Sequence, residues 1–319
     1  MKSVREANVS GKKVLVRVDF NVLPLKPREL RIEKTIPTLK YLLSKNAEIV
    51  LLTHLETNDG KIPSTKILLP YLKKYLPMDK ITLFENLRKF PGEKKNDKTF
   101  AKKLAAMGDI YVNEAFSSSH REHASIVSLP KLLPSYSGFL FEEEIKNLSK
   151  IFNSPHPFTL ILGGGKIDTK LPILKHFLPK VDFVLLGGVL LNLFTEKKGP
   201  IDSKKIILPK EIIVSAGRVL DVGSGSFEEW KKIIKRSRLI VWNGPLGYLE
   251  GGHAGGTKKL ISILSKAKSE IIIGGGDTLD CLPRVIVERT HKNFFISTGG
   301  GAMLEYLVKR TLPGIKALK

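Results

Sequence analysis

Short apolar runs rich in β-branched residues alternate along the whole chain with segments whose apolar residues recur at helical spacing. Such runs, bounded by glycine or polar residues, are typical of buried parallel strands, and the segments between them are typical of the helices that connect these strands. The pattern therefore predicts an α/β fold of consecutive strand–helix units around parallel sheets.

An irregular segment around Pro130, Pro134 and Gly138 interrupts this alternation. Before it, the pattern predicts strands at Val14–Val18, Glu48–Leu52, Ile81–Phe84 and Asp109–Val112, and helices at Thr35–Ser44, Thr65–Tyr75 and Lys98–Met107. After it, the pattern predicts strands at Phe158–Leu162, Phe183–Leu186, Leu239–Trp242, Glu270–Ile273 and Phe294–Ser297. A helical pattern over Glu142–Phe152 joins the two parts. We therefore expect two doubly wound parallel-sheet (Rossmann-like) domains, residues 1–141 and 142–307, with a tail of about residues 308–319 packing back on the first.

In the second half, glycines follow one predicted strand after another. They occur as Gly163-Gly164-Gly165, Gly187-Gly188, Gly244, Gly274-Gly275-Gly276 and Gly299-Gly300-Gly301. The carboxyl ends of parallel strands meet at one edge of a sheet, where glycine lets backbone N–H groups and helix N-termini approach an anion. One such loop is weak evidence, because tight turns also use glycine for steric reasons. Several along one edge predict an extended anionic ligand such as a nucleotide.

The glycine loops match neither of the two common nucleotide motifs. Lys166 follows three glycines but precedes Ile167, which excludes a Walker loop, and no GxGxxG opens a helix after a strand. Instead Lys166 and Lys170 lie four residues apart on the first turn of a predicted helix, where two ammonium groups can neutralise a polyphosphate. The competing interpretation of Lys170 is a solvated surface lysine.

Asp277 and Thr278 follow the glycines of GGGDT. Both can cap a helix. Alternatively, Asp277 can hold Mg²⁺, which binds proteins through one or two carboxylates plus substrate phosphates, and its place on the glycine-lined edge favours this metal role. Ser226 with Glu229 has the spacing of a capping box, which we interpret as structural.

The first half places polar residues in loops or near strand ends: Asp19, Asn21, Arg31, His54, Arg88, His120, Arg121 and His123. Arginine binds carboxylate and phosphate with its planar fork, so this set predicts a pocket for a small phosphorylated acid. A zinc site at His120 and His123 is the alternative, which the lack of a nearby cysteine and the intervening arginine disfavour.

The composition adds a large positive charge. The 319 residues include 53 Lys and Arg against 31 Asp and Glu, a formal net charge of +22. Such a charge attracts anions, but dispersed surface lysines explain much of it, and no RNA-binding motif or zinc-finger spacing accompanies it. The single Cys281 excludes an intramolecular disulfide and suits a reducing compartment. With no apolar run of membrane-spanning length and no secretory signal, we expect a cytoplasmic protein without a membrane partner.

Taken in order, several segments resemble the phosphoglycerate kinase family across nearly the whole chain: VLVRVDFNV, ENLRKFPGE, GDIYVNEAF, SHREHAS, LILGGGKIDTK, VWNGPLGYLE, IIIGGGDT and STGGGAMLEYL. The resemblance implies a monomeric, two-lobed glycolytic and gluconeogenic enzyme with a cleft between its domains. It would interconvert 1,3-bisphosphoglycerate and ADP with 3-phosphoglycerate and ATP, using Mg²⁺, by in-line transfer after hinge closure.

The family pattern also implies residue roles. The 3-phosphoglycerate site in the first domain would comprise Asp19, Asn21, Arg31, His54, Arg88 and Arg121. The nucleotide site in the second domain would comprise Gly163, Gly164, Lys166, Lys170, Gly187, Asn243, Glu250 on the ribose, Gly275, Gly276, Asp277 with the metal, and Thr278. The residues around the phosphoryl group in transfer would be Arg31, Lys166, Gly276, Gly299 and Gly300.

The chain departs from the family in its loops. The His-Leu-Gly-Arg-Pro loop is His54-Leu55-Glu56-Thr57-Asn58 here, so Thr57 stands where a substrate-binding arginine is expected. The Asp-x-Gly-Pro turn is Asp221-Val222-Gly223-Ser224, and the segments before ENLR and before Leu239 are short. Two alternatives therefore stay open: a degenerate relative that binds nucleotide without kinase activity, and a basic nucleic-acid-binding protein, for which no specific nucleic acid is expected.

Overall fold

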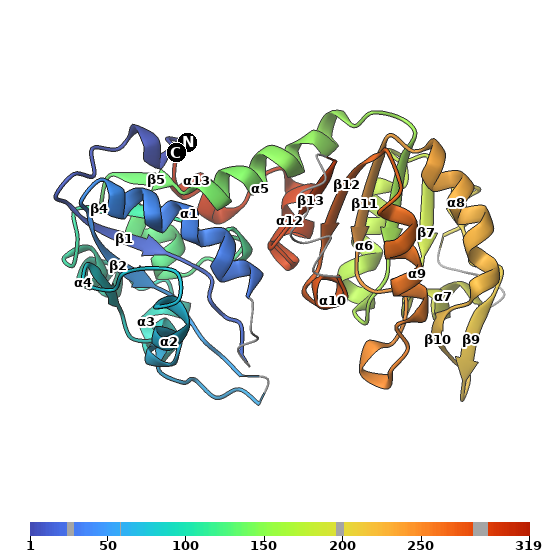
Figure 1. Cartoon of the computed structure of the whole chain (residues 1–319), viewed down its shortest axis with the longest axis horizontal. Coiled ribbons are helices and arrows are strands. Elements are labelled where there is room, and N and C mark those ends of the chain that lie inside the picture. Colours follow the sequence, from blue (N-terminus) through green and yellow to red (C-terminus); the bar gives the residue numbers. More distant parts are fainter. Residues whose placement is uncertain (24–28, 58, 196–200, 283–292) are drawn as a thin grey trace. The chain divides into compact units, whose positions relative to one another are not determined.

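The computed structural model describes residues 1–23, 29–57, 59–195, 201–282 and 293–319 (Figure 1). The chain divides into two compact units, Met1–Lys146 with Lys309–Lys319 (unit 1) and Asn147–Val308 (unit 2). The division falls inside helix α5 (Phe139–Ser149), a few residues after the expected boundary at 141. No helix in the described ranges is both long and apolar enough to cross a bilayer.

Unit 1 is built on a parallel sheet with the strand order β3-β2-β1-β4-β5. Its strands are β1 (Lys13–Arg17), β2 (Glu48–Leu52), β3 (Ile81–Leu83), β4 (Ile110–Asn113) and β5 (Ser135–Ser137). Its helices are α1 (Leu30–Ser44), α2 (Leu69–Leu72), α3 (Pro91–Lys94), α4 (Lys98–Ala105), α5 and α13 (Pro313–Ala317). Short 3-10 or π turns are η1 (Val4–Glu6), η2 (Thr65–Leu68), η3 (Leu87–Lys89), η4 (Phe116–Ser118), η5 (Ala124–Ser128) and η6 (Leu129–Lys131).

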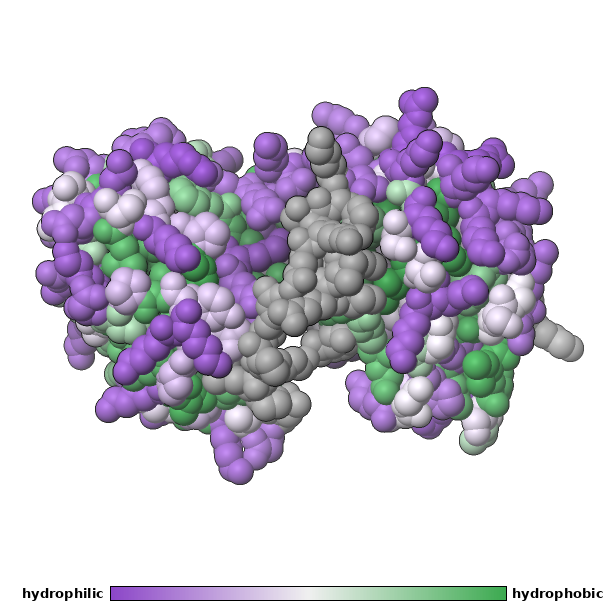
Figure 2. Space-filling view, viewed as in Figure 1, coloured by the Kyte–Doolittle hydropathy of each residue, from purple (hydrophilic) through white to green (hydrophobic). Residues whose placement is uncertain are grey.

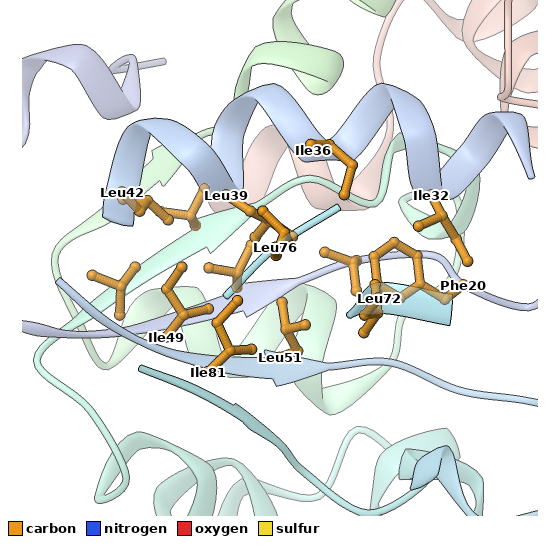
Figure 3. Close-up of a cluster of buried hydrophobic side chains, with 14 of the residues drawn as sticks. Phe20, Ile32, Ile36, Leu39, Leu42, Ile49, Leu51, Leu72, Leu76 and Ile81 are labelled. Atoms are coloured by element: carbon orange, nitrogen blue, oxygen red, sulfur yellow. The ribbon is translucent and has the colours of Figure 1, made fainter. Parts of the chain in front are cut away.

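Helix α1 buries an apolar stripe against this sheet. Ile32, Ile36, Leu39 and Leu42 recur every three or four residues and are buried, so they lie on one face of the helix. Figure 3 shows them on one side of the core cluster, with Ile49, Leu51 and Ile81 from the strands on the other. Burial of a side chain of this size contributes roughly 1.5–3 kcal/mol, so the cluster fixes the strand ends that carry the polar residues of unit 1.

Unit 2 has a six-stranded parallel sheet with the order β13-β12-β11-β6-β7-β8, and a separate antiparallel pair, β9 and β10. The strands are β6 (Phe158–Leu162), β7 (Phe183–Leu186), β8 (Ile206–Ile207), β9 (Ile212–Ser215), β10 (Arg218–Val222), β11 (Leu239–Asn243), β12 (Glu270–Gly274) and β13 (Phe294–Ile296). The helices are α6 (Ile167–Phe177), α7 (Leu190–Thr195), α8 (Phe227–Arg236), α9 (Gly255–Leu264), α10 (Gly276–Asp280) and α12 (Gly301–Lys309), with η7 (Lys150–Asn153), η8 (Ser224–Ser226) and η9 (Leu249–Gly251). On the face seen in Figure 2, hydrophilic residues cover much of this unit and of unit 1.

The predicted α/β class with two parallel sheets is confirmed, and each sheet reverses its strand order once. In unit 1 the reversal lies between β1 and β4, and in unit 2 it lies between β6 and β11. This is the doubly wound order in which ligands bind beyond the carboxyl ends of the strands, where the order reverses. Ligand sites are therefore expected at the loops after β1, β4, β6 and β11.

Two local predictions differ from the structure. The single helix expected over Thr65–Tyr75 is divided into η2 and the short α2, because Pro70 has no N–H to continue the hydrogen bonding of the preceding turn. The capping box at Ser226 and Glu229 is wrong. Ser226 has helical dihedral angles and makes no side-chain cap; its hydroxyl bonds the backbone N and O of Glu211, both at 3.0 Å.

Candidate active site

In unit 1, an acidic side chain lies at the point where the strand order reverses. Asp19, just after β1, accepts a hydrogen bond from the Ser117 hydroxyl in η4, which follows β4, and its Oδ2 is 3.5 Å from Nη1 of Arg31 in α1. Burial raises the pKa of the Asp19 carboxyl, but Arg31, His54, the Ser117 hydrogen bond and Arg17 together outweigh burial and hold that pKa far below its usual value. Asp19 is therefore an ionised carboxylate that fixes the Arg31 guanidinium.

Asn21 ties this pair to the neighbouring loop. Its backbone N donates to Asp19 Oδ1 at 3.2 Å, and its backbone O accepts from Arg31 Nη1 at 3.3 Å. Its side-chain Oδ1 accepts from the backbone N of Glu56, after β2, at 2.8 Å. Three predicted residues, Asp19, Asn21 and Arg31, thus lie in one hydrogen-bonded group.

His54, just after β2, is 3 % exposed, and its Nδ1 is 3.3 Å from Nη2 of Arg17. Burial lowers the pKa of His54 to about 3; Asp19 opposes the change, and Arg17, Arg88 and Arg121 add to it. His54 is therefore a neutral imidazole at pH 7. Arg17, which was not predicted as a site residue, is 1 % exposed and donates from Nε to Ser125 Oγ at 2.9 Å. The sequence feature that points to Arg17 is its position as a charged residue within the otherwise apolar strand VLVRV.

Arg88 and Arg121 add positive potential to the same group. Arg88 lies in η3, after β3, and its side chain is 7 % exposed. Burial lowers the pKa of Arg88, and the Arg121 charge lowers it further. The pKa of His123 falls to about 3, first through burial and then through Arg88 and Arg121. The described residues of unit 1 thus form a basic cluster, in which Arg31, Arg88 and Arg121 lie near the ionised Asp19 and near Glu56 and Glu93. Such a group of guanidinium side chains suits an anion.

The zinc alternative gains no support. His123 Nδ1 lies 3.8 Å from the buried Glu93 carboxylate, which bonds the backbone N and the hydroxyl of Ser125. Within the described ranges, no group of three or more His, Cys, Asp or Glu side chains could hold a metal ion.

In unit 2, a cavity of about 570 Å³ lies among the glycine loops. The predicted residues on its wall are Gly164, Lys166, Lys170, Asn243, Glu250, Gly275, Gly276, Thr278 and Gly300. Gly163, Gly187 and Gly299 do not line it. The loops after β6, β11 and β12 all contribute, so the cavity lies where the doubly wound topology predicts a ligand.

Some of these glycines serve loop packing. A Cβ on Gly163 would lie 2.1 Å from the backbone O of Pro245, and one on Gly187 would lie 2.6 Å from the Leu246 side chain. The same loops are joined by backbone hydrogen bonds, such as Gly164 N to Pro245 O at 2.7 Å. By contrast, Gly165 and Gly276 have nothing within 4 Å of an added Cβ, and both line the cavity. Glycine therefore serves close loop packing at Gly163 and Gly187 and leaves open wall at Gly165 and Gly276.

The two lysines of the first glycine loop have different environments. Lys166, the N-cap residue of α6, is exposed and lines the cavity. Lys170 is 6 % exposed, and its Nζ donates to Oδ1 of Asn243 at the end of β11. The surface-lysine interpretation of Lys170 is therefore wrong. Both lysines line the cavity, where their positive charge suits a polyphosphate.

The cavity also has an apolar wall that the sequence analysis missed. It is formed by Val189, Val219, Tyr248, Leu249 and Leu304. Asp221, in the altered Asp-x-Gly-Pro turn, supports this wall: its carboxylate accepts from Gly256 N at 2.9 Å, and a Cβ on Gly247 would approach it to 2.5 Å. An apolar wall beside two lysines suits a base and phosphates in one ligand.

The predicted metal residue stays a prediction. Asp277 lies on α10, next to Gly276 on the cavity wall, but its side chain is outside the described part of the chain. Thr278 is buried, and its Oγ1 accepts from Gly244 N at 3.0 Å, so it holds two glycine loops together. Among the described side chains on the wall, Glu250 supplies the carboxylate. A site with few carboxylates fits Mg²⁺, which takes its other ligands from phosphates and water.

Comparisons with known proteins agree over the whole chain. The family model described as phosphoglycerate kinase matches residues 4–79, 72–212 and 201–310. The chain is 33% identical to "Phosphoglycerate kinase" of Coprothermobacter proteolyticus over 390 aligned positions, covering 100% of this chain and 98% of the relative. It is 34% identical to the protein of the same name from Orientia tsutsugamushi, covering 100% and 97%.

Solved structures give the same result. The phosphoglycerate kinase of Pyrococcus horikoshii has a TM-score of 0.86 at 26% identity and covers 100% of this chain and 98% of that one. The enzyme of Coxiella burnetii has a TM-score of 0.79 at 28% identity, with 99% and 98% covered. The 390 aligned positions exceed the 319 residues of this chain, so the difference lies in segments that it lacks. From its sequence and its fold, this chain belongs to the phosphoglycerate kinase family.

Proposed function

We propose that this protein transfers a phosphoryl group between ATP and the carboxylate of 3-phosphoglycerate, and that it catalyses the reverse reaction from 1,3-bisphosphoglycerate and ADP. One observation carries the proposal: each unit gathers cationic side chains near the carboxyl ends of its strands. In unit 1 these are the basic cluster of Arg31, Arg88 and Arg121, and in unit 2 they are Lys166 and Lys170 at the cavity. The relatives' shared name supports the choice of substrates.

The protein itself does little covalent chemistry in this reaction. A carboxylate oxygen of 3-phosphoglycerate forms a bond to the γ-phosphorus of ATP, and the bond from that phosphorus to the bridging oxygen breaks, leaving ADP. The carboxylate is already ionised, so no general base is needed, and catalysis comes from positioning and charge stabilisation. The neutral His54 suits binding and not proton removal, because its pKa is about 3.

The roles proposed for the residues follow from their charges. Arg31, held by Asp19, and Lys166, exposed on the cavity wall, stabilise the transferring phosphoryl group. Glu250 contacts the ribose, and the open glycines Gly276 and Gly300 let backbone groups approach the phosphates. Mg²⁺ bound to the nucleotide would neutralise part of the phosphate charge, with Asp277 as the candidate protein ligand.

We also propose that the two units close about a hinge, because direct transfer requires the donor and the acceptor to come within bonding distance. We further propose that the protein is a monomer that acts in the cytoplasm. A chain with the single cysteine Cys281 suits this reducing compartment.

The test is a coupled assay of ADP formation from ATP and Mg²⁺, with 3-phosphoglycerate or with unphosphorylated glycerate as acceptor. We expect turnover with 3-phosphoglycerate and little with glycerate, because the several arginines of the basic cluster would bind the phosphate as well as the carboxylate. A protein that binds ATP but gives no turnover with either acid would be a nucleotide-binding relative without kinase activity.

A further inference from the structure

An acidic side chain lies beside the basic cluster of unit 1. Oε2 of Glu56 is 3.9 Å from Nε of Arg88. The Glu56 side chain is 38% exposed, whereas that of Arg88 is 7% exposed. The carboxylate thus faces a guanidinium that is largely out of water.

The buried guanidinium of Arg88 has a donor without a hydrogen-bond partner among the described residues. This donor is the buried Nε. Burial and the neighbouring Arg121 both disfavour the charged form of Arg88, whereas Glu56 favours it. A separation of 3.9 Å is too long for a hydrogen bond, so Glu56 supplies charge while leaving the donor open.

The backbone holds Glu56 at this position. Its N donates at 2.8 Å to Oδ1 of Asn21, which is bonded through its own N to Asp19 at 3.2 Å. The carboxylate therefore stays beside Arg88, and its partial exposure gives it room to turn toward solvent.

We propose that Glu56 is a specificity-determining residue of the acceptor site: its carboxylate is the resident counter-ion of Arg88, and an anionic acceptor must displace it. The inference rests on the proposed function, in which Arg88 binds the acceptor. An anion with a single charged group gains little beyond what Glu56 already supplies, whereas an acid with two anionic groups also gains contacts to the other arginines. The displacement lowers the affinity of every anion that binds Arg88 by a similar factor. At a given concentration the acid with two anionic groups can therefore still occupy the site when a small anion such as sulfate does not.

The test is Glu56→Gln, which keeps the size and removes the charge. We expect the KM for 3-phosphoglycerate to fall roughly threefold to tenfold, because the pair is partly screened, with a smaller change in kcat and in the KM for ATP. Calorimetric titrations with sulfate and with 3-phosphoglycerate should both show a gain in affinity, by about the same factor. The matched control is Glu48→Gln, which removes the same charge at the opposite end of β2. Glu48 begins this strand, its side chain is 62% exposed, and its carboxylate pairs with Lys13 at 3.6 Å.

An unchanged or raised KM for the acid in Glu56→Gln, or an equal fall in Glu48→Gln, would overturn the inference. The sulfate titration separates this failure from failure of the proposed function. If the wild type shows no turnover but Glu56→Gln gains sulfate affinity, the counter-ion role stands and the kinase proposal fails. If turnover is normal and sulfate affinity is the same in both proteins, the reverse holds.

Discussion

At the scale of single residues, the two candidate sites use positive charge in different settings. In unit 1 the arginines are partly or wholly buried, and Asp19 fixes Arg31. In unit 2, Lys170 is buried against Asn243, whereas Lys166 is exposed on the cavity wall. A buried cation has a fixed direction, and an exposed lysine is free to follow a charge that moves during a reaction. We therefore propose that Lys166 acts on the transition state and Lys170 on the bound nucleotide.

This assignment predicts the effect of Lys166→Ala. Removing one cation from a developing charge should lower kcat by ~10²–10³, while the affinity for nucleotide changes less. Lys175→Ala is the control, since Lys175 is an exposed lysine near the other end of α6. Steady-state rates and nucleotide titrations of both variants check the prediction, and a normal kcat in Lys166→Ala would remove this residue from the mechanism.

The glycine loops of unit 2 give a second residue-scale prediction. Gly244 has φ +94°, and a Cβ there would lie 2.2 Å from the backbone O of Gly163. Gly244→Ala should therefore lower the free energy of unfolding by roughly 2–4 kcal/mol, from backbone strain and loop displacement. Gly165→Ala, with nothing within 4 Å of the new methyl group, should change it by less than about 0.5 kcal/mol. Denaturant unfolding of the two variants decides, and equal stabilities would contradict the packing role.

At the scale of elements, the start of α5 depends on a buried carboxylate. Glu114, just after β4, accepts from the backbone N of Leu140 and of Phe141, both at 3.1 Å, and from the Thr38 hydroxyl. Burial raises the pKa of Glu114 to about 7, and these hydrogen bonds only partly oppose it. One residue thus links β4, α1 and the first turn of α5.

This raised pKa predicts a pH effect of defined sign. Between the usual value of about 4.5 and about 7, the folded state binds the Glu114 proton more strongly than the unfolded state does, so stability falls as pH rises through this window. The full effect is about 3 kcal/mol, at 1.36 kcal/mol per unit of pKa. Glu114→Gln cannot titrate, so the stability of the wild type relative to this variant should fall from pH 4.5 to 7.5. Parallel pH profiles in chemical denaturation would refute the assignment.

The elements also show what the sequence could predict. Strands with continuous apolar runs, such as β2 and β6, were predicted with their observed bounds, because burial on both faces leaves an unambiguous pattern. The short β5 and β8 and the pair β9 and β10 were missed, because β5 has no apolar run and the runs at β8 and β9 are only three residues long. Glycines following strands indicated where a ligand site lies, but not which of them pack loops, because that depends on contacts such as Gly163 with Pro245, distant in sequence. The roles of Arg17 and Glu56 likewise depend on residues that are close in space but distant in sequence.

At the scale of the whole molecule, the formal charge of +22 acts on both substrates at a distance. Such attraction is screened by salt, with a Debye length of ~30 Å at 0.01 M and ~8 Å at 0.15 M ionic strength. We expect the KM for 3-phosphoglycerate to rise severalfold over this range, with a smaller change in kcat. Steady-state kinetics at fixed pH and free Mg²⁺ check this, and a salt-independent KM would show that only local contacts bind the acid.

The central claim is that two anion sites, one in each unit, serve a single transfer. The most direct measurement is the initial rate of ADP formation by the wild type with ATP and Mg²⁺, with and without 3-phosphoglycerate, repeated with Arg31→Ala from unit 1 and Lys166→Ala from unit 2. The account predicts that ADP forms only when 3-phosphoglycerate is present, and that either substitution alone lowers this rate by at least about tenfold. ADP formation that does not depend on 3-phosphoglycerate, or a full rate in either variant, would contradict it.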